Sequence, residues 1–219
     1  MENSTKFITM QTIMFTFCIL SLLTVAIFGD FFTMKASSDV LRAIIDNFIH
    51  SAIGSMTWLI VILFKRKRNA LAVVLFEFML CAALSSIIDV DHFIMAHSSS
   101  LYDATHLMSR PYFHCSTILL VPVVIYLLSL FGRVEWMHTV SWMIFVSIFT
   151  HHIRDSIRRG MWFCPFGSTE PVPYWLYVVV LALVPSVIIG YSKHLKEIKP
   201  LFKSVHNEFK ILILDDGDV

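Results

Sequence analysis

The stretch MTWLIVILFKRKRNALAVVLFEFML, residues 56–80, consists of two apolar runs that flank four consecutive basic residues at positions 65–68. Long apolar runs predict membrane-spanning helices, and lysine and arginine concentrate in the short loops on the cytoplasmic side of a membrane. The stretch therefore predicts two spanning helices joined by a cytoplasmic turn. Because successive spans alternate in direction, this turn also sets the orientation of every other segment.

Apolar composition extends this prediction to the whole chain. Of its 219 residues, 57% are hydrophobic, whereas a soluble globular protein has about 45–50%. A spanning helix needs about 20 mostly apolar residues, and six segments meet this requirement: residues 8–29, 43–64, 70–88, 111–131, 136–152 and 174–191. We therefore expect an all-α fold in which a single domain, residues 1–219, forms a multi-pass transmembrane helical bundle of about six spans.

Charge bears on the orientation and on the class of partner. The basic turn places both termini in the cytoplasm, together with a basic tail at residues 192–219. Of the 17 lysines and arginines, eleven then lie on the cytoplasmic side and six on the other. The tail alternates lysines with apolar residues, which suits either a positive-inside anchor or a helix lying on the membrane surface. A net charge of +1 gives no electrostatic basis for binding nucleic acid, so the lipid bilayer is the expected partner.

Cysteine usage indicates no disulfide framework, since the chain has four widely spaced cysteines. Cys18 and Cys81 lie inside expected spans, where packing is the simplest role. Cys115 and Cys164 fall on the non-cytoplasmic face, where a disulfide is chemically allowed although nothing in the sequence requires one. For the compartment, we expect an endomembrane such as the endoplasmic reticulum.

Ionisable residues gather at four places in this apolar chain, at or near the ends of expected spans. The four groups are Asp46 with His50, the motif DVDH at 89–92, His114, and His151 with Asp155. The second and fourth spans begin on the non-cytoplasmic side, and the third and fifth spans end there, so all four groups are predicted to meet at that face. A charged group inside a membrane costs about 2.5–3.5 kcal/mol on insertion scales, which makes such residues functional candidates.

Mixed histidine and aspartate side chains at one face predict a divalent-metal site. Neutral imidazole nitrogens and carboxylate oxygens bind zinc at about 2.0–2.2 Å, and residues four apart on a helix, such as His151 and Asp155, present their side chains on the same face. The motif DVDH offers up to three donors in four residues, and a bridging carboxylate there can support a second ion. Zinc is the expected cofactor.

Each group taken alone has a simpler explanation. Asp46 and His50 can form a hydrogen-bonded packing pair, DVDH can cap a helix, and Arg158 with Arg159 can anchor the chain at the membrane interface. Four other residues are assigned positions outside the site: Glu77 paired within the bundle, and His97, His106 and His138 at the surface or the interface. The meeting of four groups at one face favours the metal site over these separate explanations.

The order of the motifs resembles that of bacterial inner-membrane metal-dependent hydrolases, including the LexA-regulated ones. That family carries an early His, then D-x-D-H, then H-R-G-x-T-H-S, then H-x-x-x-D-x-x-T-x-x-G before a W-P-like segment. This chain has, in the same order, His50, DVDH at 89–92, SRPYFHCS at 109–116, HHIRDSIRRG at 151–160 and WFCPF at 162–166. The resemblance implies metal-site roles for His50, Asp89, Asp91, His92, His114, His151 and Asp155.

The leading interpretation is a metal-dependent hydrolase at the non-cytoplasmic face that acts on a lipid or phosphate ester. A bound metal ion lowers the pKa of water toward 7 and so produces a nucleophile. His152 is the expected general acid or base. Arginines bind anionic groups through charge-assisted hydrogen bonds, and the expected anion-binding residues are Arg110, Arg158 and Arg159, with Arg154 as a further candidate.

Departures from the family pattern support a second interpretation. Ser109 stands where the central motif has its first His, and Arg158 stands where a Thr is expected after Asp155. His106, three residues before Ser109, is the alternative source of the missing His. A catalytically inactive relative that acts as a membrane binding or assembly protein therefore remains an alternative. A third is a carrier with a polar path formed by Asp46, His50 and Glu77.

Overall fold

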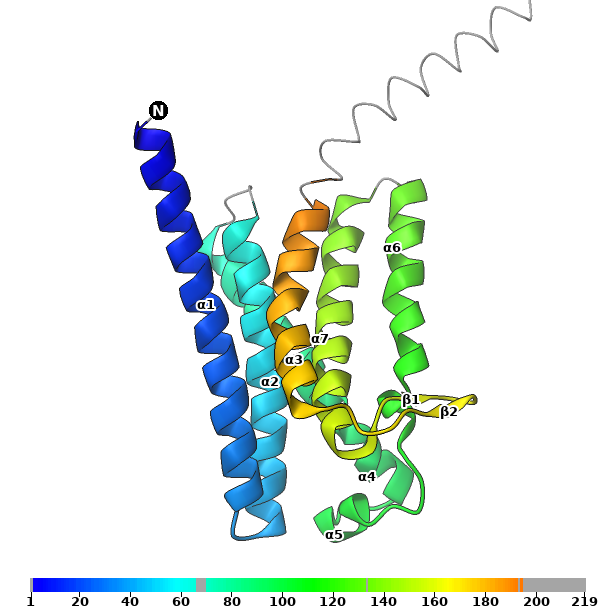
Figure 1. The fold of residues 1–219 in the computed structure, drawn as a ribbon. Helices are drawn as coiled ribbons and strands as arrows, with labels where there is room; N and C mark the ends of the chain where they lie inside the picture. The colour runs from blue at the N-terminus through cyan, green and yellow to red at the C-terminus, as the bar shows by residue number, and fades with distance from the viewer. Residues whose placement is uncertain (1, 66–69, 133, 193, 195–219) are drawn as a thin grey trace, which may run out of the picture.

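The computed structural model describes residues 2–65, 70–132, 134–192 and 194 of the chain. Its long helices stand side by side as a bundle, and short helices and a β-hairpin gather at one end (Figure 1). Together with the long apolar helices described below, this architecture confirms the prediction of an all-α multi-pass membrane protein.

Three long helices form the first part of the bundle: α1 (Glu2–Lys35), α2 (Asp39–Phe64) and α3 (Leu71–Ile87). Ser38 begins α2, because its side chain accepts a hydrogen bond from the backbone N–H of Leu41 and satisfies one of the free donors at the helix start. α2 packs against α1, against α3 and against the later helix α7 (Glu135–Arg159). It is therefore the helix around which the others are arranged.

Shorter elements follow α3 and build the end of the bundle that carries the hairpin. They are α4 (Val90–Ala96), α5 (Leu101–Thr105), the 3-10 turns η1 (Tyr112–His114) and η2 (Ser116–Leu119), and the strands β1 (Trp162–Phe163) and β2 (Gly167–Ser168). Helix α6 (Leu120–Gly132) runs from this end along the bundle and packs against α7 (Figure 1). The two strands pair antiparallel, with Trp162 opposite Ser168. A last helix, Tyr174–Ser192, returns along the bundle and contributes to its core.

Four helical segments among the described residues are long and apolar enough to cross a membrane: Thr9–Lys35, Asp39–Phe64, Leu71–Ala96 and Tyr174–Ser192. They coincide with the first, second, third and sixth expected spans. The fifth expected span, residues 136–152, is part of α7, which carries a heavier load of polar residues. The number of spans therefore remains a prediction, although the helices lie where the apolar runs placed them.

The fourth expected span was wrong at its start. An apolar helix was expected from residue 111, but the chain forms the 3-10 turn η1 there, and the helical apolar segment begins only at Ser116. Pro111 has no backbone N–H to donate, and the backbone N–H of Phe113 donates to the carboxylate of Asp91 at 2.6 Å. These two residues divert the chain from a regular helix and hold it beside α4.

Close approach of α2 and α3 depends on Gly54. A Cβ atom at this position would lie 1.9 Å from Oγ of Ser85 on α3, so only glycine permits this separation. Small residues at helix contacts are typical of membrane proteins, in which packing replaces the hydrophobic effect between helices. The core around this contact contains the fully buried side chains of Ile53 and Trp58 from α2 and Val146 from α7.

Helix α7 ends at Gly160, beside the hairpin. Gly160 has a φ of +70°, a left-handed conformation that favours glycine. A Cβ atom there would lie 1.9 Å from the carbonyl oxygen of Thr169. The chain therefore turns sharply after Arg159, and the turn brings β1 and β2 against the end of the helix.

Pairings within the bundle test two smaller predictions. Cys115 and Cys164 form a disulfide with a Cα–Cα distance of 5.7 Å, a bridge that the chemistry of that face allowed and the cysteine count did not predict. It ties η2 to the hairpin.

Glu77 accepts a hydrogen bond from Nε1 of Trp58 at 3.0 Å, which confirms that this carboxylate is paired inside the bundle.

The start of α1 and the end of the last helix lie at the same end of the bundle, away from the hairpin (Figure 1). This arrangement agrees with termini on one side of a membrane, while the cytoplasmic assignment remains a prediction. Residues 66–68 of the basic turn and residues 195–219 of the basic tail lie outside the described part of the chain.

Candidate metal centre

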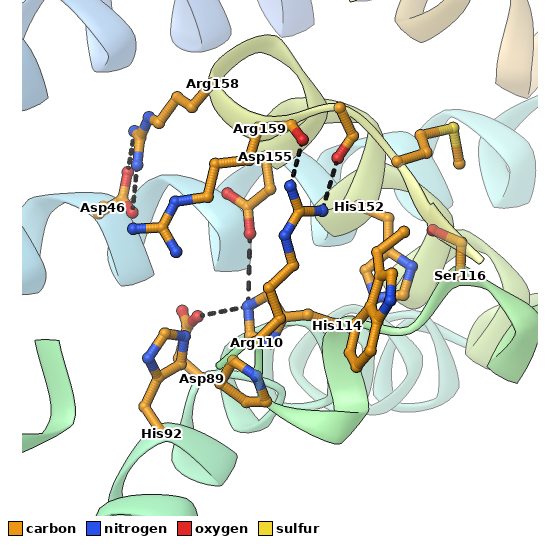
Figure 2. A pocket seen from close by; sticks show the side chains of 14 residues that line it. Asp46, Asp89, His92, Arg110, His114, Ser116, His152, Asp155, Arg158 and Arg159 are labelled. Atoms are coloured by element: carbon orange, nitrogen blue, oxygen red, sulfur yellow. Dashed lines mark hydrogen bonds and ion pairs between the residues drawn. The ribbon is translucent and has the colours of Figure 1, made fainter. Parts of the chain in front are cut away.

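The four groups of ionisable residues meet beside the hairpin end of the bundle. His151 and Asp155 lie one turn apart on α7, Asp89 lies at the junction of α3 and α4, and His114 ends η1. Figure 2 shows the imidazole of His114 between the carboxylates of Asp89 and Asp155. His50 reaches the same group from α2, where it is 1% exposed.

Two imidazole nitrogens and two carboxylates form the centre of this group. Nε2 of His114 and Nε2 of His151 lie 3.3 Å apart. Each of these nitrogens also lies 3.4 Å from Oδ1 of Asp89 and 3.4 Å from Oδ2 of Asp155. Ligands bound at about 2.0–2.1 Å in a tetrahedral arrangement lie roughly 3.3–3.4 Å from one another. The separations therefore suit atoms that share one ion.

Hydrogen bonds at the far side of each ring turn these nitrogens inward. Nδ1 of His151 lies 2.9 Å from the carbonyl oxygen of Ser85. Because a carbonyl only accepts, Nδ1 carries the proton and Nε2 keeps its lone pair. Nδ1 of His114 lies 3.3 Å from Oδ1 of Asp91, which has the same effect. Histidines that bind metals are commonly oriented in this way by a carbonyl or a carboxylate.

His50 provides a direct test of whether the site suits a metal ion. Its ring stacks on that of His151 with centroids 3.7 Å apart, and its Nε2 lies 3.2 Å from Oδ1 of Asp155. Neither ring nitrogen of His50 makes a hydrogen bond to any described residue, although both are buried. A buried polar atom without a partner is costly. The polar neighbour of Nε2 is Oδ1 of Asp155 at 3.2 Å, and this spacing matches that of two ligands of one cation, so the residues present fit a metal ion.

Among the described residues, donor atoms fall into three sets, each with atoms within 4.8 Å of one another. These sets are His50, His151 and Asp155; Asp89, His114 and His151; and Asp91, His92 and His114. The first and third sets share no residue, and the second set lies between them. Nitrogen and oxygen donors of this kind suit zinc and similar divalent transition metals.

Asp91 and His92 lie at the edge of the centre. Asp91 is 5% exposed and uses its oxygens to hold the backbone of Phe113 and Nδ1 of His114. Nδ1 of His92 lies 3.0 Å from the carbonyl oxygen of Ala104, so its Nε2 is the free ligand atom. The structure thus places Asp91 where it orients His114, a role that the motif order alone did not distinguish from direct ligation.

A cavity of about 160 Å³ opens beside the centre and is lined by His114, Asp89 and Asp155. His152 also lines it. Nε2 of His152 donates to the carbonyl oxygen of Phe113 at 2.8 Å, and its Nδ1 has no hydrogen-bond partner among the described residues. The predicted general acid or base therefore lies at the cavity with one ring nitrogen free to accept a proton.

Three of the four candidate arginines line the same cavity: Arg110, Arg158 and Arg159. Arg110 donates to the backbone carbonyls of Arg159 and Gly160 at the end of α7 (Figure 2), where cations are favoured. Partial burial and the nearby charge of Arg159 lower the pKa of Arg110. Arg158 is 44% exposed and forms a bidentate ion pair with Asp46, with N–O distances of 2.7 and 3.2 Å.

The fourth candidate, Arg154, lies elsewhere. Its side chain is fully buried, with Nε 2.8 Å from Asp30 on α1 and Nη2 2.8 Å from Asp46 on α2. Tyr174, at the start of the last helix, donates to the other oxygen of Asp30 at 3.1 Å. Arg154 therefore ties three helices together from the same turn of α7 as His151 and Asp155, and it does not line the cavity of the candidate centre.

Sequence reasoning missed Asp30, whereas its placement of His106 at the surface is confirmed. Asp30 follows directly on the expected first span, and the apolar run continues after it through Phe31 and Phe32. A carboxylate inside an apolar run is expected to have a buried partner or a functional role, and this pattern could have identified Asp30. His106, the alternative source of the missing family His, is exposed and bonds to the carbonyl of Tyr102. It belongs to none of the three donor sets, and Ser109 is exposed as well.

The other histidines assigned outside the site lie away from the donor sets. His97 is exposed, as expected of a surface residue. His138 is half-buried, with its ring 4.9 Å from that of Tyr126. Neither belongs to a donor set among the described residues.

The chain is similar to animal proteins named transmembrane protein 267. It is 46% identical over 159 residues to that of Xenopus laevis, which is 71% of each chain, and 41% identical over 156 residues to that of Mus musculus, 70% of each chain. No family model matches the chain, and no solved structure matches it. The resemblance to bacterial hydrolases therefore rests on the motifs alone. Identity of this level over more than two thirds of both relatives shows that the chain belongs to the transmembrane protein 267 family.

Proposed function

We propose that this protein is a metal-dependent hydrolase of a lipid phosphate ester, with its metal centre at the non-cytoplasmic face. The proposal is carried by one observation: His114 and His151 direct their Nε2 atoms toward each other and toward Asp89 and Asp155, at separations of 3.3–3.4 Å. A hydrogen-bonded packing pair involves only two residues. Here four side chains from three different parts of the chain meet, and a shared metal ion explains this arrangement.

The metal ligands in this proposal are His50, Asp89, His114, His151 and Asp155. His92 is the ligand available for a second ion, since its Nδ1 is held by a carbonyl. A bound divalent ion supplies a Lewis acid and brings the pKa of a water molecule to about 7. The motif order of the bacterial hydrolases implies these residues and also Asp91, which in this proposal orients His114.

Residues around the cavity have separate tasks. His152 accepts a proton at Nδ1, because its Nε2 proton is already donated to the carbonyl of Phe113. Arg158 and Arg159 line the cavity beside Asp155 and bind the phosphate oxygens through charge-assisted hydrogen bonds. Arg110 holds the end of α7 in place through its two carbonyl contacts.

The test measures metal content and turnover on the same purified samples. Full-length protein in lipid vesicles should contain stoichiometric metal and hydrolyse at least one member of a panel of phosphate-bearing lipids. His151→Ala should lose both properties. Arg158→Ala combined with Arg159→Ala should keep the metal and lose turnover, because these side chains bind the substrate and not the ion. His97→Asn is the matched control, since His97 is exposed and has a φ of 49° that asparagine tolerates.

Two results would count against the proposal in different ways. Wild-type protein without bound metal would remove the metal centre itself. Wild-type protein with stoichiometric metal and no turnover would favour the alternative, a relative that binds metal but has lost catalysis. The exposed position of Ser109, outside the cavity, supports that alternative, because the loop it occupies supplies no ligand where the bacterial motif has a histidine.

A further inference from the structure

A second, larger cavity continues from the candidate centre toward the side of the bundle. It has a volume of about 760 Å³, compared with about 160 Å³ for the cavity at the centre. The two cavities share Asp46, Asp89, His92, Arg158 and Arg159 as lining residues. The small inner cavity and the wide outer cavity therefore adjoin at these five residues.

The wide part is a groove between α2 on one side and α4 and α5 on the other. Val40, Ile44 and Phe48 line it from α2 and are 56%, 62% and 67% exposed. They are spaced four apart and so lie along one face of the helix. Phe93 and Leu101 line the opposite side. Polar residues such as Arg42, Asn47 and Ser51 line the rest of the groove, and the apolar stripe on α2 with Phe93 and Leu101 is the part that suits an alkyl chain.

The two arginines mark the other end of this space. Arg158 and Arg159 lie where the groove meets the small cavity. Arg158 can leave its partner Asp46 without stranding that carboxylate, because Nη2 of the buried Arg154 also lies 2.8 Å from Oδ1 of Asp46. The guanidinium of Arg158 is 44% exposed, and Arg154 can neutralise Asp46 in its place. Arg158 is therefore suited to bind an incoming anion.

We infer that the substrate is a lipid with an unsubstituted phosphate head, which enters sideways from the bilayer with its tail in the α2–α5 groove. This inference rests on the proposed function and specifies its substrate. The charge of Arg158 and Arg159 complements the phosphate, and the apolar stripe on α2 complements the tail. The inner cavity of about 160 Å³ is below the roughly 300–1,000 Å³ typical of small-molecule sites, which favours a phosphate head without a sugar or choline attached to it.

The test uses phosphatidic acid with a photoreactive diazirine in one acyl chain, incorporated in phosphatidylcholine vesicles that contain the full-length protein. After illumination, mass spectrometry locates the adducts. They should concentrate on residues 40–51 and 93–104, and unlabelled phosphatidic acid should displace them whereas added phosphatidylcholine should not. Arg158→Gln combined with Arg159→Gln should reduce displaceable labelling about tenfold or more, since charge-assisted hydrogen bonds are lost.

Two further variants sharpen this experiment. Lys35→Gln is the matched control, because Lys35 is an exposed cation at the end of α1 that lines neither cavity; it should leave labelling unchanged. Ala43→Trp should fill the groove and abolish displaceable labelling while metal content stays at the wild-type value. Ala43 lines the groove and belongs to none of the donor sets among the described residues.

The inference is overturned if adducts spread over lipid-facing helices such as α6, or if phosphatidylcholine displaces the probe as well as phosphatidic acid does. It is also overturned if Lys35→Gln and the double arginine variant have equal effects. Labelling requires no turnover. If the protein hydrolyses no lipid, the proposed hydrolase activity is refuted, but the adduct map still tests whether the lipid tail binds in the groove.

Discussion

Asp91 lies on the Nδ1 side of His114, with its Oδ1 3.3 Å from that nitrogen, while Nε2 of the same ring faces Asp89 and Asp155. One ring thus connects an orienting carboxylate to the donor atoms of the candidate centre. The two aspartates of the motif, Asp89 and Asp91, consequently contact different nitrogens of His114. The difference has a measurable consequence for metal affinity.

Asp91→Asn should weaken metal binding about 10–100-fold without abolishing it, the usual effect of losing an outer-shell partner. Asp89→Asn should remove stoichiometric metal, because it eliminates a ligand oxygen. Competition with a chromogenic chelator measures both affinities. Asp103→Asn, which removes an exposed carboxylate bonded to Ser98, is the control. Equal losses for the variants at 89 and 91 would contradict the orienting role of Asp91.

Arg154→Met should destabilise the protein strongly, by about 3–5 kcal/mol, because it leaves the buried carboxylate of Asp30 without its cation. Adding Asp30→Leu should recover part of that loss, since a buried pair replaced by apolar side chains is often tolerated. Thermal unfolding in detergent, followed by tryptophan fluorescence, gives the order of stabilities. If the double variant unfolds at a lower temperature than Arg154→Met, the pairing of these two residues is not what stabilises this part of the bundle.

Gly54→Ala should destabilise the α2–α3 contact by about 1–3 kcal/mol, the usual cost of overpacking. It should also lower metal affinity, because the displaced Ser85 holds Nδ1 of His151 through its carbonyl. Gly190→Ala is the matched control, since nothing lies within 4 Å of a Cβ atom there, and alanine in a helix should be neutral or slightly stabilising. Unfolding temperature and chelator competition report the two effects. Metal affinity unchanged in Gly54→Ala would show that Ser85 does not position His151.

Cys115→Ser combined with Cys164→Ser should lower stability by about 2–4 kcal/mol, the usual contribution of a disulfide, here between residues 49 apart in sequence. Modification with a maleimide polymer under denaturing conditions should detect two thiols before reduction and four after it, since Cys18 and Cys81 are free. Because disulfides persist in oxidising compartments, the same result supports a non-cytoplasmic hairpin. Four reactive thiols without reduction would remove that support.

A cysteine placed at Ser99 should react with an impermeant reagent from the non-cytoplasmic side of intact vesicles. Ser99 is exposed, in the connection between α4 and α5, and the alternation of spans places that connection opposite the basic turn. A variant without the four native cysteines provides the background. Labelling only from the cytoplasmic side would reverse the orientation, although the contacts between the histidines and aspartates would be unaffected.

Much of the architecture could be predicted from the chain alone, because the free energy of placing a residue in a membrane depends mainly on that residue and its near neighbours. The apolar runs around the basic turn located α2 and α3, and the last run located Tyr174–Ser192. Side-chain periodicity placed His151 with Asp155 on one face of α7. Alternation of direction then brought His114 and Asp89 to the same end, where the structure has them.

Tertiary structure decided what each of these residues contacts. The partner of Arg154 is Asp30, 124 residues away, and the nitrogen that His151 directs inward depends on the carbonyl of Ser85. Such contacts depend on how each helix is rotated about its axis and on how closely its neighbours approach, as Gly54 permits for α2 and α3. Hydropathy and spacing are properties of one segment at a time, so they predict which residues reach a face but not how those residues pair across it.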